Sequence, residues 1–213
     1  MIKLINDDCI NAMQQMEEGI IDLTVTSPPY DNLRTYEGSL VWDEGIWKQV
    51  LEQLYRVTKK SGVVVWVVGD ATIKGSETGT SFKQALYAME CGFNLHDTMI
   101  WCKDNPVPTQ STRYQNAFEY MFVFSKGRPN VFGKLQTPSK LAGMRMKKHR
   151  ASGGLGHTYN EEGFYNVKPT KLRSNWWVKS CGSPVKGHGA VFPLQLAHDH
   201  IISWSNEDDT VFD

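Results

Sequence analysis

The chain has 213 residues, 40% of them hydrophobic, and its 23 Lys and Arg are balanced by 23 Asp and Glu. This length and composition suit one domain with an inserted segment. No stretch reaches the length of a membrane-spanning helix, and the amino end does not have the pattern of a signal peptide. The spacing of the four cysteines fits neither a zinc site nor a disulfide framework, which favours a reducing cytoplasm.

The amino-terminal residues predict a strand, a helix and a second strand. Residues 4–9 are expected to form a short strand that ends in acidic side chains, and residues 10–16 a helix. Asp8 stands where its carboxylate can cap that helix. The apolar alternation of residues 21–25 then predicts a buried strand.

The run Thr26-Ser27-Pro28-Pro29-Tyr30 directly follows this strand. Two prolines fix φ and remove two backbone donors, so the chain forms a rigid corner at the carboxyl end of the strand. The Ser27 hydroxyl and the Pro28 carbonyl can accept hydrogen bonds from an exocyclic amino group, and Tyr30 can stack on the ring of a base taken out of its duplex. Taken alone, the run also fits a plain strand-to-loop corner.

The next elements alternate between helix and strand. Helices are predicted at residues 47–58 and 81–90, and strands at 63–68, 93–101 and 118–125, with residues 59–62 ending the first helix. The continuous apolar run at 63–68 is typical of a strand covered on both faces of a parallel sheet. The pattern predicts a doubly wound α/β fold with ligands at the carboxyl ends of the strands.

Positive charge is concentrated in one part of the chain. Residues 126–179 hold twelve of the 23 Lys and Arg but only two of the 23 Asp and Glu, on a Gly-rich stretch that also contains many aromatic side chains. Such a segment suits neutralisation of a nucleic-acid backbone together with base contacts. A solvated charged loop is the alternative for its densest cluster, residues 144–150. The predicted nucleic-acid-binding residues are Arg145, Lys147, Lys148, Arg150, Lys171 and Arg173.

The last part of the chain returns to the α/β pattern. A short strand is predicted at residues 175–178, a helix at 194–204 and the start of a strand within 207–213. His198 and His200 flank Asp199, but a group of this kind without a third ligand is more typical of a surface than of a metal site, and no metal is expected. The predicted divisions are an α/β portion at 1–126, a basic segment at 127–179 and a return to the α/β domain at 180–213.

The motif and its flanking sequence resemble S-adenosylmethionine-dependent methyltransferases that act on amino groups of bases in double-stranded DNA. The Ser form of the Pro-Pro-Tyr motif is commoner in enzymes that modify cytosine N4 than in those that modify adenine N6. Residues 116–127 resemble the motif that closes the target-base pocket in that family. By this resemblance the catalytic residues are Ser27, Pro28, Pro29 and Tyr30. The resemblance also implies that residues 1–126 are the catalytic portion with the base pocket and that the basic residues of 127–179, the target-recognition segment, bind DNA. The cofactor-binding residues implied are Asp8 and Cys9 at the adenine, His188, Phe192 and Pro193 at the methionine end, and Asp213.

The order of the motifs resembles the circularly permuted β group, a Rossmann-like class I sheet in which a Gly-rich cofactor loop would follow the strand that ends at Asp213. The resemblance therefore implies a sheet that is incomplete at the C-terminus. It also implies weak or absent cofactor binding by this chain alone, unless a second chain, further C-terminal residues or a dimer partner completes the site. One alternative is a catalytically incompetent DNA-binding subunit. Another is methylation of protein glutamine or ribosomal RNA, because similar Pro-Pro-Tyr corners serve those reactions.

Overall fold

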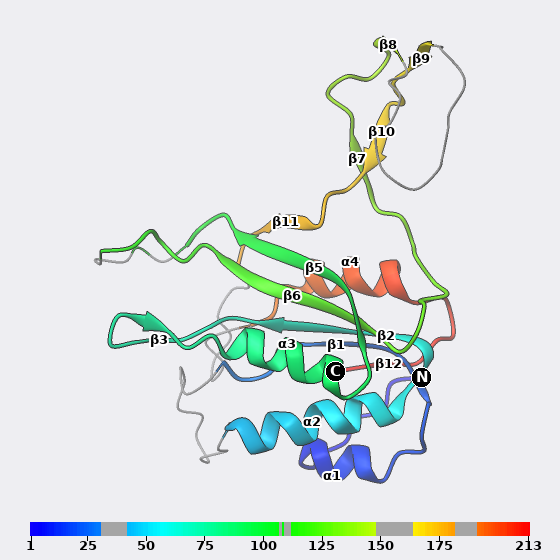
Figure 1. The fold of residues 1–213 in the computed structure, drawn as a ribbon. Coiled ribbons are helices and arrows are strands. Elements are labelled where there is room, and N and C mark those ends of the chain that lie inside the picture. Colours follow the sequence, from blue (N-terminus) through cyan, green and yellow to red (C-terminus); the bar gives the residue numbers. More distant parts are fainter. Residues whose placement is uncertain (31–41, 107, 109–111, 148–163, 182–190) are drawn as a thin grey trace. The chain divides into compact units, whose positions relative to one another are not determined.

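The computed structural model describes residues 1–30, 42–106, 108, 112–147, 164–181 and 191–213, and it divides the chain into two compact units (Figure 1). Unit 1 consists of Met1–Gly133 and Asn175–Asp213, and unit 2 of Lys134–Ser174. Each unit is described by itself below.

Unit 1 is built on a six-stranded sheet with the order β11-β5-β6-β2-β1-β12. Its strands are β1 (Ile21–Thr26), β2 (Thr58–Val68), β5 (Asn94–Lys103), β6 (Phe118–Ser125), β11 (Trp176–Lys179) and β12 (Val211–Phe212). A separate two-stranded hairpin joins β3 (Thr72–Ile73) to β4 (Ser76–Glu77). The α/β class predicted from the sequence is confirmed, and the predicted strand at 118–125 has the same bounds in the structure.

Helices cover both faces of this sheet (Figure 1). On one face, α1 (Cys9–Gln14), α2 (Glu44–Val57) and α3 (Thr80–Glu90) bury their apolar side chains against alternate residues of β2 and β6. On the other face lies α4 (Leu194–Trp204), which contacts β1 and places the His200 ring against Met121. The helix predicted at 194–204 has these bounds in the structure.

Strand β2 is the centre of the core. Its residues from Val63 to Val68 are all at most 2% exposed, because successive side chains point to opposite faces and both faces are covered. The indole nitrogen of Trp66 donates to Gln84 Oε1 of α3 at 2.8 Å, so the largest buried side chain keeps its polar atom satisfied. The prediction of a strand buried on both faces is therefore confirmed.

The sheet is mixed, whereas the sequence pattern predicted a parallel one. Strand β6 runs antiparallel to both neighbours, β5 and β2, and the other pairs in the sheet are parallel. No helical pattern lies between residues 103 and 118, and a parallel connection needs a crossover, usually a helix. The return from β5 to β6 is therefore antiparallel.

The strand predicted at residues 4–9 is wrong. Residues 1–6 have no helix or strand, and the Leu4 side chain is 93% exposed. A strand needs a neighbour for its backbone groups, and among the described residues none pairs with this segment. One edge of β1 is partly covered, because β12 pairs with it at Leu23 and Thr24.

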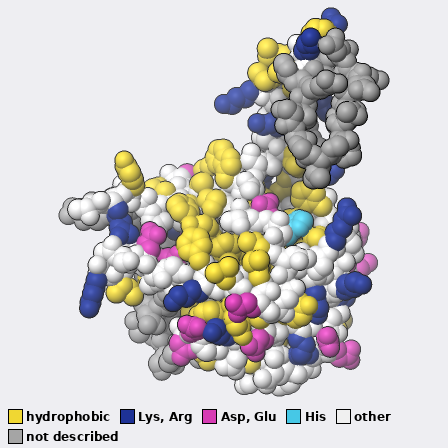
Figure 2. Space-filling view, viewed as in Figure 1, with side chains coloured by type: hydrophobic (Ala, Val, Ile, Leu, Met, Phe, Trp, Pro, Cys, Tyr) yellow, Lys and Arg dark blue, Asp and Glu magenta, His cyan; other side chains and the backbone are white. Residues whose placement is uncertain are grey.

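Unit 2 consists, in its described residues, of two short antiparallel pairs. Strand β7 (Gln136–Pro138) pairs with β10 (Thr170–Leu172), and β8 (Arg145–Lys147) pairs with β9 (Phe164–Asn166). On the face shown in Figure 2, the described residues of unit 2 present Lys, Arg and hydrophobic side chains. The Arg145 guanidinium lies 4.7 Å from the centre of the Phe164 ring.

Candidate active site

The topology of unit 1 brings six strand ends to one edge of the sheet. Strands β1, β2, β5, β11 and β12 run in one direction and β6 runs in the other. Their carboxyl ends therefore share an edge with the amino end of β6. In α/β sheets this edge is where ligands bind.

Four side chains at this edge form one hydrogen-bonded network. Ser27 Oγ lies 2.9 Å from the Tyr30 hydroxyl, which donates to Glu119 Oε2 at 2.5 Å. The other carboxylate oxygen of Glu119, Oε1, forms an ion pair with Lys103 Nζ at 2.6 Å. Glu119 is only 9% exposed, so its charge is held by these partners rather than by water.

Two residues that follow β2 complete this edge. Gly69 lies against Tyr30 and Glu119, since a Cβ atom at position 69 would be 3.5 Å from the Tyr30 ring and 3.6 Å from Glu119 Cγ. Asp70 accepts hydrogen bonds from the backbone N–H of Ser81 at 2.9 Å and from its hydroxyl at 2.5 Å. Asp70 therefore fixes the beginning of α3 to the end of β2.

The structure brings Ser27 and Tyr30, two of the four predicted catalytic residues, into direct contact. Pro28 and Pro29 lie between them, both half-buried, and form the rigid corner that the sequence predicted. Tyr30 packs against the core, and its hydroxyl holds Glu119. Its stacking on a target base stays a prediction.

The predicted cofactor residues lie on three elements. Asp8 Oδ1 accepts from the backbone N–H groups of Ile10 and Asn11 and so caps α1, as predicted. Cys9 is exposed as a residue, while partial burial of its thiol, aided by the charge of Asp8, raises its pKa. Asp213 follows β12 at the shared edge of the sheet.

The other cofactor residues precede α4. Phe192 contacts the Trp101 ring edge-on at 6.4 Å between centroids, and the buried Pro193 forms the N-cap of α4. His188, the remaining residue of this group, lies outside the described residues.

The histidines of α4 have different environments. His198 is exposed, as expected, but His200 is fully buried, with Nε2 3.3 Å from Met121 Sδ and its ring 4.5 Å from the centre of the Trp177 ring. The expectation of a surface position is therefore wrong for His200. Among the described residues, no group of three or more His, Cys, Asp and Glu side chains could hold a metal ion, and no helix could cross a membrane.

The predicted DNA-binding residues that the structure describes all belong to unit 2. Arg145, Lys147 and Lys171 are exposed, and Arg173 is half-buried. Lys148 and Arg150 lie outside the described residues. The described part of unit 2 carries seven Lys and Arg and no Asp or Glu, so it presents a basic surface.

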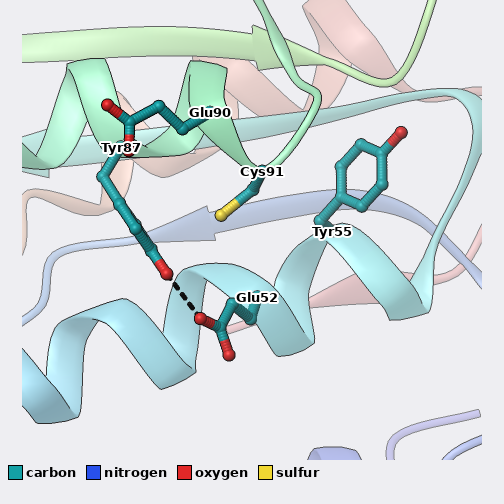
Figure 3. Close-up of a pocket in the computed structure, with 5 residues that line it drawn as sticks. All are labelled: Glu52, Tyr55, Tyr87, Glu90 and Cys91. Atoms are coloured by element: carbon teal, nitrogen blue, oxygen red, sulfur yellow. Dashed lines mark hydrogen bonds between the residues drawn. The ribbon is translucent and has the colours of Figure 1, made fainter.

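An open pocket of about 270 Å³ lies elsewhere, between α2 and α3 (Figure 3). It is lined by Glu52, Tyr55, Tyr87, Glu90 and Cys91, none of which is a predicted site residue. The Tyr87 hydroxyl donates to Glu52 Oε1 at 2.5 Å, and this bond, with burial, raises the pKa of Tyr87 to about 12. We assign no ligand to this pocket.

Sequence reasoning missed Lys103, Glu119 and Gly69. Glu119 carried a signal, because it is the one charged residue in the otherwise apolar strand at 118–125. A charge in a buried strand needs a partner, but its partners, Tyr30 and Lys103, lie far away in the sequence. Their pairing follows from the order of the strands, which the sequence alone did not supply.

Comparison with known proteins identifies the family. A sequence model of the DNA methylase family N6_N4_Mtase matches residues 21–213. The chain is 48% identical over 206 residues to the orphan methyltransferase M.BamHII of Bacillus amyloliquefaciens, covering 91% of this chain and 75% of that protein. It is 26% identical over 163 residues to the type II methyltransferase M.MwoI of Methanothermobacter wolfeii, covering 70% of this chain and 24% of that one.

Solved structures share the fold. The cytosine-N4-specific PvuII DNA methyltransferase matches with a TM-score of 0.66 and 20% identity, covering 96% of this chain and 71% of that one. The SAM complex of M1.HpyAVI matches with a TM-score of 0.58 and 19% identity, covering 99% and 81%. The cofactor of the family is S-adenosylmethionine, as predicted. The chain belongs to the N6_N4_Mtase family of DNA methylases.

Proposed function

We propose that this chain transfers a methyl group from S-adenosylmethionine to the exocyclic amino nitrogen of a base flipped out of double-stranded DNA. The observation that carries the proposal is the Ser27–Tyr30 corner at the ligand-binding edge of the sheet, where Ser27 is exposed and hydrogen-bonded to Tyr30. The match of residues 21–213 to a DNA methylase family supports the same reaction.

The residues present at this edge fit the cofactor. The helix cap at Asp8 uses one carboxylate oxygen, Oδ1, and a carboxylate has a second oxygen that can accept from a ligand. Phe192 provides an aromatic face before α4, and Asp213 is exposed beyond β12. When bound, S-adenosylmethionine supplies an activated methyl group on its sulfonium.

The residues of this chain would orient and polarise the acceptor nitrogen. Hydrogen bonds from the amino group to Ser27 Oγ and to the Pro28 carbonyl draw the nitrogen lone pair out of conjugation with the ring, while Tyr30 holds the base. No covalent base adduct and no catalytic cysteine are needed. The Ser form of the motif favours cytosine N4 over adenine N6, and the PvuII enzyme, which shares the fold, is cytosine-N4-specific.

Unit 2 supplies the recognition of DNA in this proposal. In the order of the sequence it comes after the Pro-Pro-Tyr corner and before the cofactor residues that precede α4. The target-recognition segment has this place in the sequence of a circularly permuted enzyme of the β group. Its exposed basic side chains suit contacts to phosphates. The same proposal includes a second chain or dimer partner that completes the cofactor site. It also places the methyl transfer in a reducing cytoplasm.

Incubation of the purified chain with duplex DNA and labelled S-adenosylmethionine, followed by mass spectrometry of the nucleosides, tests this function. We expect label in 4-methylcytosine, with 6-methyladenine as the second outcome that supports the proposal. Parallel reactions with ribosomal RNA and with protein test the alternatives in which a similar Pro-Pro-Tyr corner methylates RNA or protein glutamine. Unmodified DNA that still binds the chain would contradict methyl transfer by this chain alone and would favour a DNA-binding subunit that depends on a second chain for its cofactor site.

A further inference from the structure

The network at the sheet edge has a direction, which follows from counting its protons. An ammonium group has only donors, so Lys103 donates to the Glu119 carboxylate. That carboxylate accepts at its other oxygen the single proton of the Tyr30 hydroxyl. The 2.9 Å bond between Ser27 and Tyr30 must then use the proton of Ser27.

A serine hydroxyl whose proton is already donated in one hydrogen bond can only accept a hydrogen bond from a third group. We propose that Lys103 and Glu119 are positioning residues that, through Tyr30, fix the Ser27 hydroxyl as a hydrogen-bond acceptor and so select a base with an amino group. An amino group offers protons to this oxygen, whereas a ring carbonyl in the same place would meet a second acceptor. The inference rests on the proposed function. No proton moves along the network, which only sets which atoms donate.

The energetics of the ion pair support a role other than stability. Glu119 is 9% exposed, and the Lys103 side chain is 21% exposed, so both charges lose much of their hydration. Buried pairs of this kind are often no more stabilising than apolar residues of the same volume. The neighbours of Glu119 in β6 are aromatic, and an apolar residue would suit the strand, but only a carboxylate imposes this direction on the hydroxyls.

The packing keeps the network in place. A Cβ atom at position 69 would lie 3.5 Å from the Tyr30 ring and 3.6 Å from Glu119 Cγ, so both side chains lie close to the backbone that follows β2. The Tyr30 ring also packs against the core formed with α1, α2 and α3. The hydroxyl of Tyr30 is therefore held between Ser27 and Glu119 rather than turned toward solvent.

The carbon-13 resonance of Tyr30 Cζ tests the direction without any need for activity. A phenol that donates has its Cζ resonance moved toward the phenolate value, and one that accepts has it moved away. We expect Glu119→Gln to move the Tyr30 resonance away from the phenolate value and Ser27→Ala to move it toward that value. Reversed signs, or shifts in the same direction, would overturn the proposal. Tyr30→Phe assigns the resonance.

The surface pair Tyr87–Glu52 is the matched control (Figure 3). It has the same donor, acceptor and 2.5 Å distance but joins α2 to α3 away from the predicted site residues. Glu52→Gln is expected to move the Tyr87 resonance away from the phenolate value and to leave methyl transfer unchanged. This control separates loss of a Tyr–Glu bond in general from loss of the bond at the site.

A double-mutant cycle tests whether Glu119 acts through Ser27. We expect Glu119→Gln to lower kcat by about 10-fold or more while the KM for DNA stays the same, and to have no further effect in the Ser27→Ala background. Equal effects in both backgrounds would mean a merely structural role and would overturn the proposal. If the wild-type chain transfers no methyl group, the proposed function fails, and the Tyr30 resonance alone decides the direction of the network.

Discussion

At the scale of residues, the site is a short stretch of sequence held by distant partners. Ser27 and Tyr30 come from one motif, yet the group that orients them, Glu119, follows 89 residues after Tyr30 in the chain. A motif can supply the accepting oxygen, but the direction in which its hydroxyl donates depends on the side chains that the sheet places beside it. The local motif and the long-range network are therefore both parts of one site.

Gly69 gives a prediction at this scale. A methyl group at position 69 would make ordinary contacts of 3.5 to 3.6 Å with Tyr30 and Glu119, whereas a larger side chain would displace the Tyr30 ring. We expect Gly69→Ala to keep methyl transfer within about twofold of wild type and Gly69→Leu to lower kcat by about 10-fold or more. Melting temperatures of both variants serve as the control for folding. Full activity of Gly69→Leu would contradict the close packing at this edge.

At the scale of elements, hydrogen bonds between side chains fix the helices to one another and to the sheet. Asp70 holds the beginning of α3 at the end of β2, and Tyr87 and Glu52 join α3 to α2. The α2–α3 bond contains a titratable group with a shifted pKa. We therefore expect it to contribute to the pH dependence of stability.

Tyr87→Phe tests that contribution. The pKa of Tyr87 is raised to about 12 in the folded chain, while the pKa of an unfolded tyrosine is about 10. The folded state therefore favours the neutral phenol more strongly than the unfolded state does. Its stabilisation is present in full below about pH 10 and is lost as the pH rises through about 12. We expect the urea midpoint of the wild type to fall more steeply over this window than that of Tyr87→Phe. Tyr114→Phe, at an exposed position, should behave like the wild type, and equal slopes for Tyr87→Phe and the wild type would contradict the shift.

Part of this architecture could be read from the sequence, and the reason differs from element to element. The strand at 118–125 and the helix at 194–204 have local patterns of apolar residues strong enough to give their bounds. The prediction of a strand at residues 4–9 was wrong because a strand forms only beside a partner strand, and that partner can lie far away in the sequence. The antiparallel β6 and the Glu119 network likewise depend on which strands are neighbours, which apolar periodicity does not specify.

At the scale of the whole molecule, the basic surface and the Pro-Pro-Tyr corner are on different units. Unit 1 carries the Pro-Pro-Tyr corner and the residues assigned to the cofactor, and the described part of unit 2 carries only basic charges. This separation predicts that DNA affinity and methyl transfer respond to different substitutions. The balanced composition of the chain as a whole conceals this division.

Substitutions in unit 2 test the division of labour. We expect Arg145→Ala and Lys171→Ala each to weaken DNA binding and to reduce the slope of log K against log salt by about 0.9 if each side chain contacts one phosphate. Fluorescence anisotropy over a range of salt concentrations gives the slope. Lys83→Ala, at an exposed position of α3 in unit 1, is the matched control and should leave the slope unchanged. A slope that is the same for all three variants and the wild type would rule out these contacts.

The catalytic role of the Pro-Pro-Tyr corner is tested most directly by methyl transfer to duplex DNA by the wild-type chain and by Ser27→Ala, with DNA affinity and melting temperature measured on the same preparations. Loss of the accepting oxygen should lower the rate about 100-fold or more, because this oxygen acts where charge develops on the nitrogen, while DNA affinity and folding stay close to the wild type. Ser27→Ala that methylates DNA as fast as the wild type would contradict the assignment of this corner as the catalytic site.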